Sequence, residues 1–319
     1  MIKNTLALLI FLNVYFNCIS QEIKFSKRKT TIEYINPPNG VYLYDNVFID
    51  KTEISNLAYL EYLSHIRKDS TESFYNSQLP DSLCYQVKLQ PNDSINPFIY
   101  HYFRYPGFRF YPVIGVSYEQ ALNYCKWRGE VVTESFAKGD YHSKFPKLKD
   151  FDIIVEYRLP TKEEWELAAL GGLNFLDFPY GVDRPIKNKY YSFKIKNSSF
   201  LICQNKNSIN YKDSDIIHKI EFNVYEDYYL NIVNPVSCKS DTSFSLSYIF
   251  DFSSNGYGLY NMIGNVAEMT MTKGLAKGGS FRSKLNDFNI KTDFQYSYPT
   301  EWLGFRCVAI MHIRRKNNG

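Results

Sequence analysis

Residues 112–127 read PVIGVSYEQALNYCKW, and along this stretch the chain passes from a strand into a helix. The apolar residues 113–116 are typical of a strand end. Ser117 and Gln120 then form an S-x-x-Q capping box, in which each side chain satisfies a free backbone N–H of the other residue. The sequence therefore predicts a helix that begins after Ser117 and runs through Trp127.

The same signal occurs again in residues 157–170, YRLPTKEEWELAAL. Thr161 and Glu164 form the second capping box, with Pro160 just before it, so a second helix begins here. Upstream, residues 41–49 alternate enough to predict a strand. Residues 55–68 carry leucines and isoleucine at a three-residue spacing, which predicts a helix.

The remaining segments show little periodicity. Residues 69–107 are polar with scattered aromatic side chains and are expected to form a long insertion or loop, and residues 171–256 are expected to be irregular. The overall pattern predicts a single loop-rich α+β domain with short strands and few helices. We expect a signal peptide at 1–20, a linker at 21–40, the domain at 41–312 and a basic tail at 313–319.

The composition is that of a globular protein with no footprint for nucleic acid. The 319 residues are 45% apolar, and the formal net charge is +4. No basic run is long, and the late cluster 314–316 is explained by a solvated tail, so no nucleic-acid partner is expected. The 28 Tyr and 24 Phe residues favour an aromatic core over a binding face.

The first twenty residues have the layout of a secretory signal. Lys3 precedes an apolar run at 6–16, and small or polar residues follow as far as Ser20. We expect cleavage after Ser20, with lipidation of Cys18 as the alternative. The run is too short to anchor the chain across a bilayer, and no other long apolar segment exists. The protein is therefore expected to be exported to the periplasm or the outer membrane, without a transmembrane helix in the mature chain.

The six cysteines do not form a local metal or redox motif. No two of them are close in sequence, which excludes a zinc ribbon and a CxxC site. The five histidines are also too far apart for a local pair of metal ligands. Loss of Cys18 with the signal would leave an odd number of thiols in a compartment that permits disulfides.

Five segments in order resemble motifs of the formylglycine-generating enzyme family, also called sulfatase-modifying factors. They are 50–56 (DKTEISN), 112–127 (PVIGVSYEQALNYCKW), 157–170 (YRLPTKEEWELAAL), 255–270 (NGYGLYNMIGNVAEMT) and the pair 277–280 with 304–308 (KGGS and GFRCV). Order and spacing hold over roughly residues 41 to 310. The resemblance implies the C-type-lectin-like fold of that family.

The resemblance also implies which residues would do the chemistry. Catalytic members oxidise a substrate cysteine with molecular oxygen, using two cysteines that bind copper(I) in the pattern GGS-x-x-C-x-x-x-x-C. Here Ser283 and Phe288 occupy those two positions. Hydroxyl and phenyl groups cannot replace soft thiolate ligands, so we expect no copper and a pseudoenzyme. The His-x-x-x-His motif of related iron-dependent branches is absent as well.

The family's calcium motif is retained. The resemblance places a structural calcium ion on the oxygen atoms of Asn261, Gly264, Val266 and Glu268. The alternative is a tight turn in which Glu268 only caps backbone amides. A second calcium site would involve Asn205, Asp227 and Tyr229.

Other family positions have structural roles. Cys125 and Cys307 stand where the family forms a disulfide, which would close a long loop; two buried free thiols are the alternative. Arg158 and Arg306 are expected to be buried ions that tie loops to the core, because a buried arginine needs paired acceptors.

Three functions remain open. The segments GNVAE (264–268) and CKWRGEVVTE (125–134) resemble the gliding-motility lipoproteins GldK and GldJ, which implies an envelope protein that binds a protein partner in gliding motility or type IX secretion. The second hypothesis is a formylglycine-generating-type or other oxidoreductase with an atypical metal site, drawing on Cys84, Cys203 and Cys238. The third is a carbohydrate- or surface-binding module that uses exposed aromatic side chains.

Overall fold

The computed structural model describes residues 22–23, 33–85, 101–142, 145–182, 186–188, 228–230, 246–283 and 288–316. Residues 1–21 with Cys18, together with Cys203, Asn205, Asp227 and Cys238, lie outside these ranges. Within them no helix is both long and apolar enough to cross a membrane.

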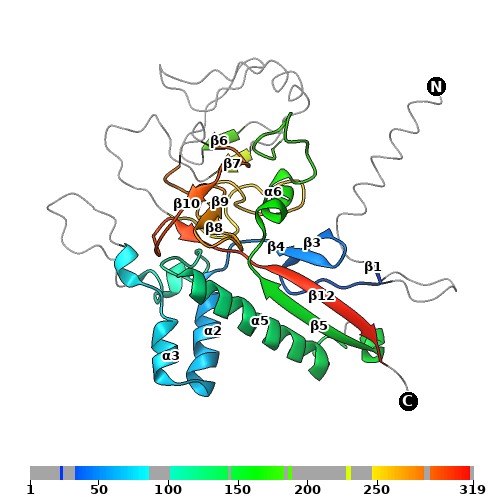
Figure 1. Ribbon diagram of the computed structural model, residues 1–319. Helices are drawn as coiled ribbons and strands as arrows, with labels where there is room; N and C mark the ends of the chain where they lie inside the picture. Colours follow the sequence, from blue (N-terminus) through cyan, green and yellow to red (C-terminus); the bar gives the residue numbers. More distant parts are fainter. Residues whose placement is uncertain are drawn as a thin grey trace, which may run out of the picture.

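One half of the fold is a four-stranded antiparallel sheet in the order β3-β4-β12-β5 (Figure 1). Its strands are β3 (Gly40–Tyr44), β4 (Val47–Asp50), β5 (Phe151–Arg158) and β12 (Val308–Arg315). The long helix α5 (Tyr118–Lys138) packs against β5, and α2 (Asn56–Asp69) packs against α5. The helix α3 (Glu72–Ser77) runs beside α2.

The other half is a smaller sheet of very short strands in the order β10-β9-β8-β11. Its strands are β8 (Ala267–Met269), β9 (Leu275–Lys277), β10 (Phe294–Gln295) and β11 (Leu303–Gly304). The helix α6 (Lys162–Leu170) lies on this side of the molecule in Figure 1. Few helices and short strands joined by long loops confirm the expected loop-rich α+β domain.

Both predicted capping boxes are present. Ser117 and Gln120 begin α5 and Thr161 and Glu164 begin α6, each with both reciprocal hydrogen bonds. The predicted end of the first helix at Trp127 is wrong, because α5 continues to a left-handed Gly139. Gly129 inside α5 has a packing reason: a Cβ there would lie 3.0 Å from the carbonyl oxygen of Val155 in β5.

The predicted single strand at 41–49 is a hairpin. The chain turns between β3 and β4 at Asp45, whose φ of +44° is a left-handed conformation that Asp tolerates better than most residues. The described parts of the segment 69–107 are also more ordered than predicted. They contain α3 and two short 3-10 helices, η1 (Ser82–Tyr85) and η2 (Pro106–Phe108).

Four short strands and one 3-10 helix complete the described elements. They are β1 (Glu22–Ile23), β2 (Glu33–Tyr34), β6 (Ile186–Asn188), β7 (Tyr228–Leu230) and η3 (Pro146–Asp150). β1 pairs with β2 inside the predicted linker, and β6 pairs with β7 inside the region predicted as irregular. β12 extends to Arg315, three residues into the predicted tail.

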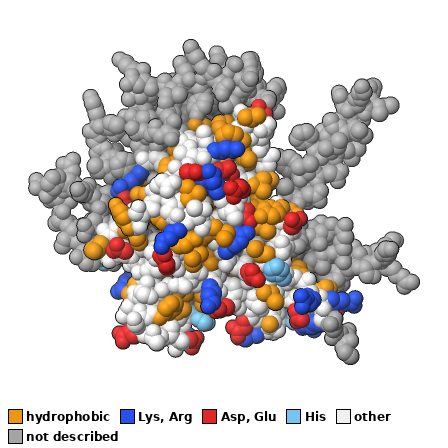
Figure 2. Space-filling view, in the orientation of Figure 1, with side chains coloured by type: hydrophobic (Ala, Val, Ile, Leu, Met, Phe, Trp, Pro, Cys, Tyr) orange, Lys and Arg blue, Asp and Glu red, His pale blue; other side chains and the backbone are white. Residues whose placement is uncertain are grey.

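Three clusters of buried apolar side chains fill the molecule. The largest joins α2, α5 and the four-stranded sheet, and the second joins α6 to the 257–263 turn and Phe288. The third is small and contains Tyr102, Leu246, Val266 and Phe281. On the face shown in Figure 2, acidic and basic side chains are interspersed with apolar ones, without a field of one sign.

Candidate functional site

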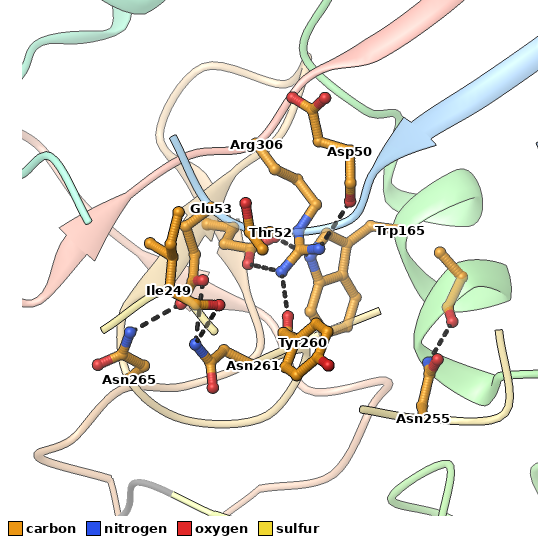
Figure 3. A network of polar contacts seen from close by, with 12 residues as sticks. Asp50, Thr52, Glu53, Trp165, Ile249, Asn255, Tyr260, Asn261, Asn265 and Arg306 are labelled. Atoms are coloured by element: carbon orange, nitrogen blue, oxygen red, sulfur yellow. Dashed lines mark hydrogen bonds and ion pairs between the residues drawn. The ribbon is translucent and has the colours of Figure 1, made fainter. Parts of the chain in front are cut away.

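An ion pair with no exposure to solvent lies between the two sheets. Arg306, just before β12, donates from Nε to Oε2 of Glu268 at 2.6 Å and from NH2 to Oε1 at 2.5 Å (Figure 3). Trp165 of α6 donates its indole N–H to Oε2 of the same carboxylate at 2.7 Å. Such a bidentate pair fixes both groups geometrically, so α6, β8 and the chain entering β12 are held to one another.

Arg306 also collects backbone oxygens from two other segments. Its NH1 donates to the carbonyl of Asp50 at 2.9 Å and its NH2 to the carbonyl of Tyr260 at 2.8 Å. Each of these N–H groups of Arg306 therefore has an acceptor within the protein, as a buried guanidinium requires. The prediction that Arg306 is a buried structural ion is confirmed.

A second ion pair joins the helix α5 to the end of β4 in the four-stranded sheet. Arg128 of α5 donates to both carboxylate oxygens of Asp50, at 2.6 and 2.8 Å, and lies over the ring of Tyr157 at 4.2 Å. Asp50 also accepts the backbone N–H of Cys307 at 3.0 Å. The pair joins the end of β4 to the long helix and to β12.

Glu53 is the buried carboxylate without a cation of its own. It lies in the loop after β4 and accepts hydrogen bonds from the side-chain amides of Asn261, at 3.1 Å, and Asn265, at 2.9 Å. Arg306 is already paired with Glu268, so the cluster holds one negative charge more than it can neutralise. Burial is the main reason that the pKa of Glu53 rises to about 8, and the nearby charge of Arg306 only partly offsets it.

The turn predicted to hold calcium carries two asparagines in left-handed backbone conformations, Asn261 and Asn265. The amide nitrogen of Asn261 faces Glu53 and the carbonyl of Ile249. The carboxylate of Glu268, the expected calcium ligand, is also engaged by Arg306 and Trp165.

No group of three or more His, Cys, Asp or Glu side chains suited to a metal occurs among the described residues. Calcium at the turn stays a prediction. Of the second predicted calcium set, Tyr229 lies in β7, and the other two residues are outside the described ranges.

The segment after β9 carries the two positions where the family has its cysteines. A Cβ placed on Gly279 would meet the ring of Phe288 at 2.9 Å and the hydroxyl oxygen of Ser283 at 3.0 Å. The two positions are therefore brought together beside this glycine, although four residues separate them in sequence. Gly279 has φ of +65°, which together with this close approach accounts for a glycine here.

What occupies the two positions is structural. Phe288 is buried in the second apolar cluster and meets Phe294 edge-on, with ring centroids 5.6 Å apart. The hydroxyl of Ser283 accepts the backbone N–H of Ser280 at 3.0 Å, and its own N–H returns to the carbonyl of Ser280. The ring of Phe288 and the hydroxyl of Ser283 thus occupy the space beside Gly279.

The predicted disulfide partners are neighbours. Cys125 on α5 and Cys307 before β12 are both buried, and their sulfurs are 3.5 Å apart as thiols. The bond itself stays a prediction. Cys84 is half-buried next to Gly115, and burial, followed by Asp81 and Glu301, raises the pKa of its thiol. Such a thiol is a poor nucleophile at neutral pH.

Arg158 ties its loop to the core as expected, but it is only half-buried, with 24% of its side chain exposed, and is not the buried ion that the sequence predicted. It forms a bidentate pair with Glu164, at 2.6 Å to each oxygen, and Tyr44 donates its hydroxyl to the same carboxylate at 2.7 Å. Burial opposes ionisation of Glu164, but these bonds and the N–H of Thr161 bring its pKa down to about 2. Glu164, the second member of the capping box of α6, therefore also binds side chains of β3 and β5.

Three charged residues of this interior were not singled out from the sequence. Asp50 and Glu53 stand in the opening motif, 50–56, and were noted only as part of that motif. Lys277 is fully buried and donates to Glu166 at 2.8 Å and to Asp293 at 3.0 Å. In the sequence, these residues could be recognised as charged residues inside or beside an apolar run. The sequence alone does not show which residue each of them pairs with.

Comparisons with known proteins agree with these motifs. The sequence model of the family described as "Sulfatase-modifying factor enzyme 1-like domain" matches residues 20–311. The chain is 27% identical over 161 residues to the formylglycine-generating enzyme of Mus musculus, which covers 50% of this chain and 27% of that protein. It is 28% identical over 163 residues to the Bos taurus protein named "Inactive C-alpha-formylglycine-generating enzyme 2", covering 51% of this chain and 33% of that protein.

The match therefore spans about a third or less of the length of these two relatives. Among solved structures, the crystal structure of CarF aligns with a TM-score of 0.40 and 18% identity, covering 91% of this chain and 94% of that chain. Since the family model covers nearly the whole chain, the protein belongs to the sulfatase-modifying factor enzyme 1-like domain family.

Proposed function

We propose that this protein is an exported, non-catalytic member of its family that acts as a binding or assembly component of the cell envelope. The observation that carries the proposal is that Ser283 and Phe288 lie together beside Gly279. The positions converge, but neither side chain offers a sulfur, and the phenyl ring has no lone pair with which to hold a metal.

The rest of the domain supports a binding role. The charged network around Arg306 and Arg128 keeps the loops in place, so the domain retains its shape where the positions for chemistry are changed. One of the relatives that the chain matches is itself named inactive. The export signal and the likeness to gliding-motility lipoproteins suggest an envelope partner, with gliding motility or type IX secretion as its setting.

The proposal is tested by an activity assay. Purified protein is incubated with a Cys-x-Pro-x-Arg peptide, copper, a reductant and oxygen, and the peptide mass is read. We expect no aldehyde above a no-protein control, whereas the formylglycine-generating enzyme of Mus musculus should convert the peptide in parallel. Turnover by the wild-type chain would overturn the proposal and favour an oxidoreductase with an atypical metal site.

A double variant shows whether the two positions explain the result. Ser283→Cys with Phe288→Cys places two thiols beside Gly279, and we expect it to bind copper(I) where the wild type does not. Ser283→Ala with Phe288→Leu is the matched control, since it changes the same positions without adding sulfur. Equal copper(I) binding by wild type and double variant would show that the ligands lie elsewhere.

The envelope role needs a separate measurement. The tagged protein is cross-linked and recovered from its native envelope, with Ser20 and Gln21 checked as the cleavage point by N-terminal sequencing. Recovery of a secretion or motility protein is the expected result. An N-terminus that still begins at Met1 would contradict export.

A further inference from the structure

Two segments place large aromatic side chains in solvent. The first, residues 101–111, reads HYFRYPGFRFY, and the second, 248–250, reads YIF. Tyr105 is 57% exposed, Phe110 51%, Phe250 53% and Tyr248 44%. Single exposed apolar residues are normal, but four large rings from two adjoining segments form a patch that needs an explanation.

The two segments are fixed side by side. The backbone N–H of Ile249 donates to the carbonyl of Phe110 at 2.8 Å, and the rings of Tyr111 and Tyr248 lie 4.6 Å apart. Asn56, the first residue of α2, holds the first segment by donating to the carbonyls of Tyr102 and Phe108. The exposed rings therefore stand on backbone that is tied to the body of the domain.

The patch contains two arginines and no acidic residue, although Asp251 follows Phe250 directly in the chain. Arg104 and Arg109 are exposed and flank Tyr105 and Phe110 in the chain, and neither makes an ion pair with any acidic side chain in the part of the chain that the structure describes. By contrast, Arg282 at the surface is paired with Glu301 at 2.5 Å. Residues 101–111 contain no Asp or Glu.

We propose that this aromatic–arginine patch, made of Arg104, Tyr105, Arg109, Phe110, Tyr248 and Phe250, binds an acidic segment of a protein partner. The proposal deepens the binding role proposed above and rests on it. Tyr, Phe and Arg are the residue types enriched at the centres of protein interfaces. The two arginines supply the attraction for carboxylates, and the rings supply apolar area at low entropic cost.

The ring geometry favours a protein over a polysaccharide. A sugar chain that stacks on aromatic side chains needs several ring faces pointing the same way. Here neighbouring rings are inclined to one another: 56° for Tyr111 and Tyr248, 60° for Tyr105 and Phe108, and 77° for Phe250 and Tyr260. Rings at these angles make knobs and hollows that suit the side chains of a polypeptide.

The test uses a random copolymer of glutamate and tyrosine as the acidic polypeptide and polygalacturonate as the acidic polysaccharide. Binding of each to the full chain is measured at low and at physiological salt. We expect the copolymer to bind, with an affinity that falls as salt rises, and polygalacturonate to bind at least tenfold more weakly. No binding of the copolymer, or tighter binding of the polysaccharide, would overturn the proposal.

Variants locate the binding. Arg104→Gln with Arg109→Gln should weaken copolymer binding at least tenfold and remove most of its salt dependence. Tyr105→Ser with Phe110→Ser should weaken it by a similar factor at all salt concentrations. The matched controls are Arg315→Gln and Tyr298→Ser, which change exposed residues outside the patch and should leave binding unchanged.

Thermal melting of each variant checks that the fold is kept. If the controls weaken binding as much as the patch variants, the patch is not the site. This result is distinct from failure of the proposed function, because peptide oxidation by the wild-type chain would expose that failure whatever the copolymer does.

Discussion

The interior around Arg306 and the described residues 278–283 meet at Trp165, whose ring borders Gly278 and whose indole N–H reaches Glu268, but they differ in what they keep of the family pattern. In the interior, Arg306, Glu268 and Trp165 form closed polar contacts between elements far apart in sequence. In the second region, the two glycines of the GGS motif at 278–280 are retained, while Ser283 and Phe288 stand at the positions expected to bind copper. The comparison suggests that the domain keeps its shape through the buried charges and that the chemical positions changed without disturbing them.

The largest effect is expected from breaking the central pair. Glu268→Ala leaves the guanidinium of Arg306 buried without a carboxylate, which should lower the free energy of unfolding by about 3–5 kcal/mol. Urea denaturation measures the loss. Glu134→Ala is the matched control, because Glu134 pairs with Lys138 at the surface of α5. A loss as small as that of the control would mean that the interior pair does not hold the fold.

The next effect concerns the two cysteines that join α5 to β12. We expect Cys125 and Cys307 to be disulfide-bonded in protein recovered from the envelope, and reduction should then lower the free energy of unfolding by about 2–4 kcal/mol. Non-reducing peptide mapping identifies the link, and the double variant Cys125→Ser with Cys307→Ser should be insensitive to reductant. Free alkylation of both thiols in envelope protein would contradict the bridge.

The unpaired carboxylate of the interior should make stability depend on pH. The pKa of Glu53 is raised to about 8 in the folded protein, so between roughly pH 5 and 8 the native state keeps a proton that the unfolded chain has lost. Stability contributed by this group is therefore complete below that window and falls as pH rises through it. The expected slope is about 1.4 kcal/mol per pH unit at most.

Glu53→Gln is the comparison for that slope, since it has nearly the same shape but cannot ionise; its one amide oxygen can accept from only one of Asn261 and Asn265. Denaturation curves at half-unit steps from pH 5 to pH 9 should show a flatter profile for the variant. An identical profile in both proteins would show that Glu53 keeps an ordinary pKa.

The smallest expected effect is that of calcium. We propose that an ion at the Asn261 turn is held by neutral oxygens, because Glu268 is engaged by Arg306, and such a site binds weakly. At a calcium concentration equal to the dissociation constant, the gain is only about 0.4 kcal/mol. Melting with calcium and with a chelator should differ slightly. A large shift that Glu268→Ala abolishes would instead make Glu268 a ligand.

The parts of the fold that could be predicted are those with a local signal. The capping boxes at Ser117 and Thr161 fixed two helix starts correctly, because both partners of each box lie within four residues. The family motifs predicted the domain, and they also predicted that Cys125 and Cys307 would lie next to each other. The end of α5 was missed because helix length there is decided by packing against β5, which local periodicity does not contain.

The candidate site was predicted less completely, for the same reason. The partners of Arg306 are 38 and 256 residues away in the chain. The sequence indicated that Arg306 would be buried but not that Glu268 would be its acceptor. Glu53 gave no signal of its own, since its raised pKa comes mainly from burial by segments that are far from it in sequence.

The position of β12 bears on how the chain reaches its native state. This strand lies inside the larger sheet between β4 and β5, although it follows every other described strand in sequence. Its partners are therefore far from it along the chain, and contacts of such high sequence separation slow folding. The sheet cannot close until residues 308–315 have left the ribosome. The proposed export of an unfolded chain through a membrane would need such a delay, and the order of the strands supplies it.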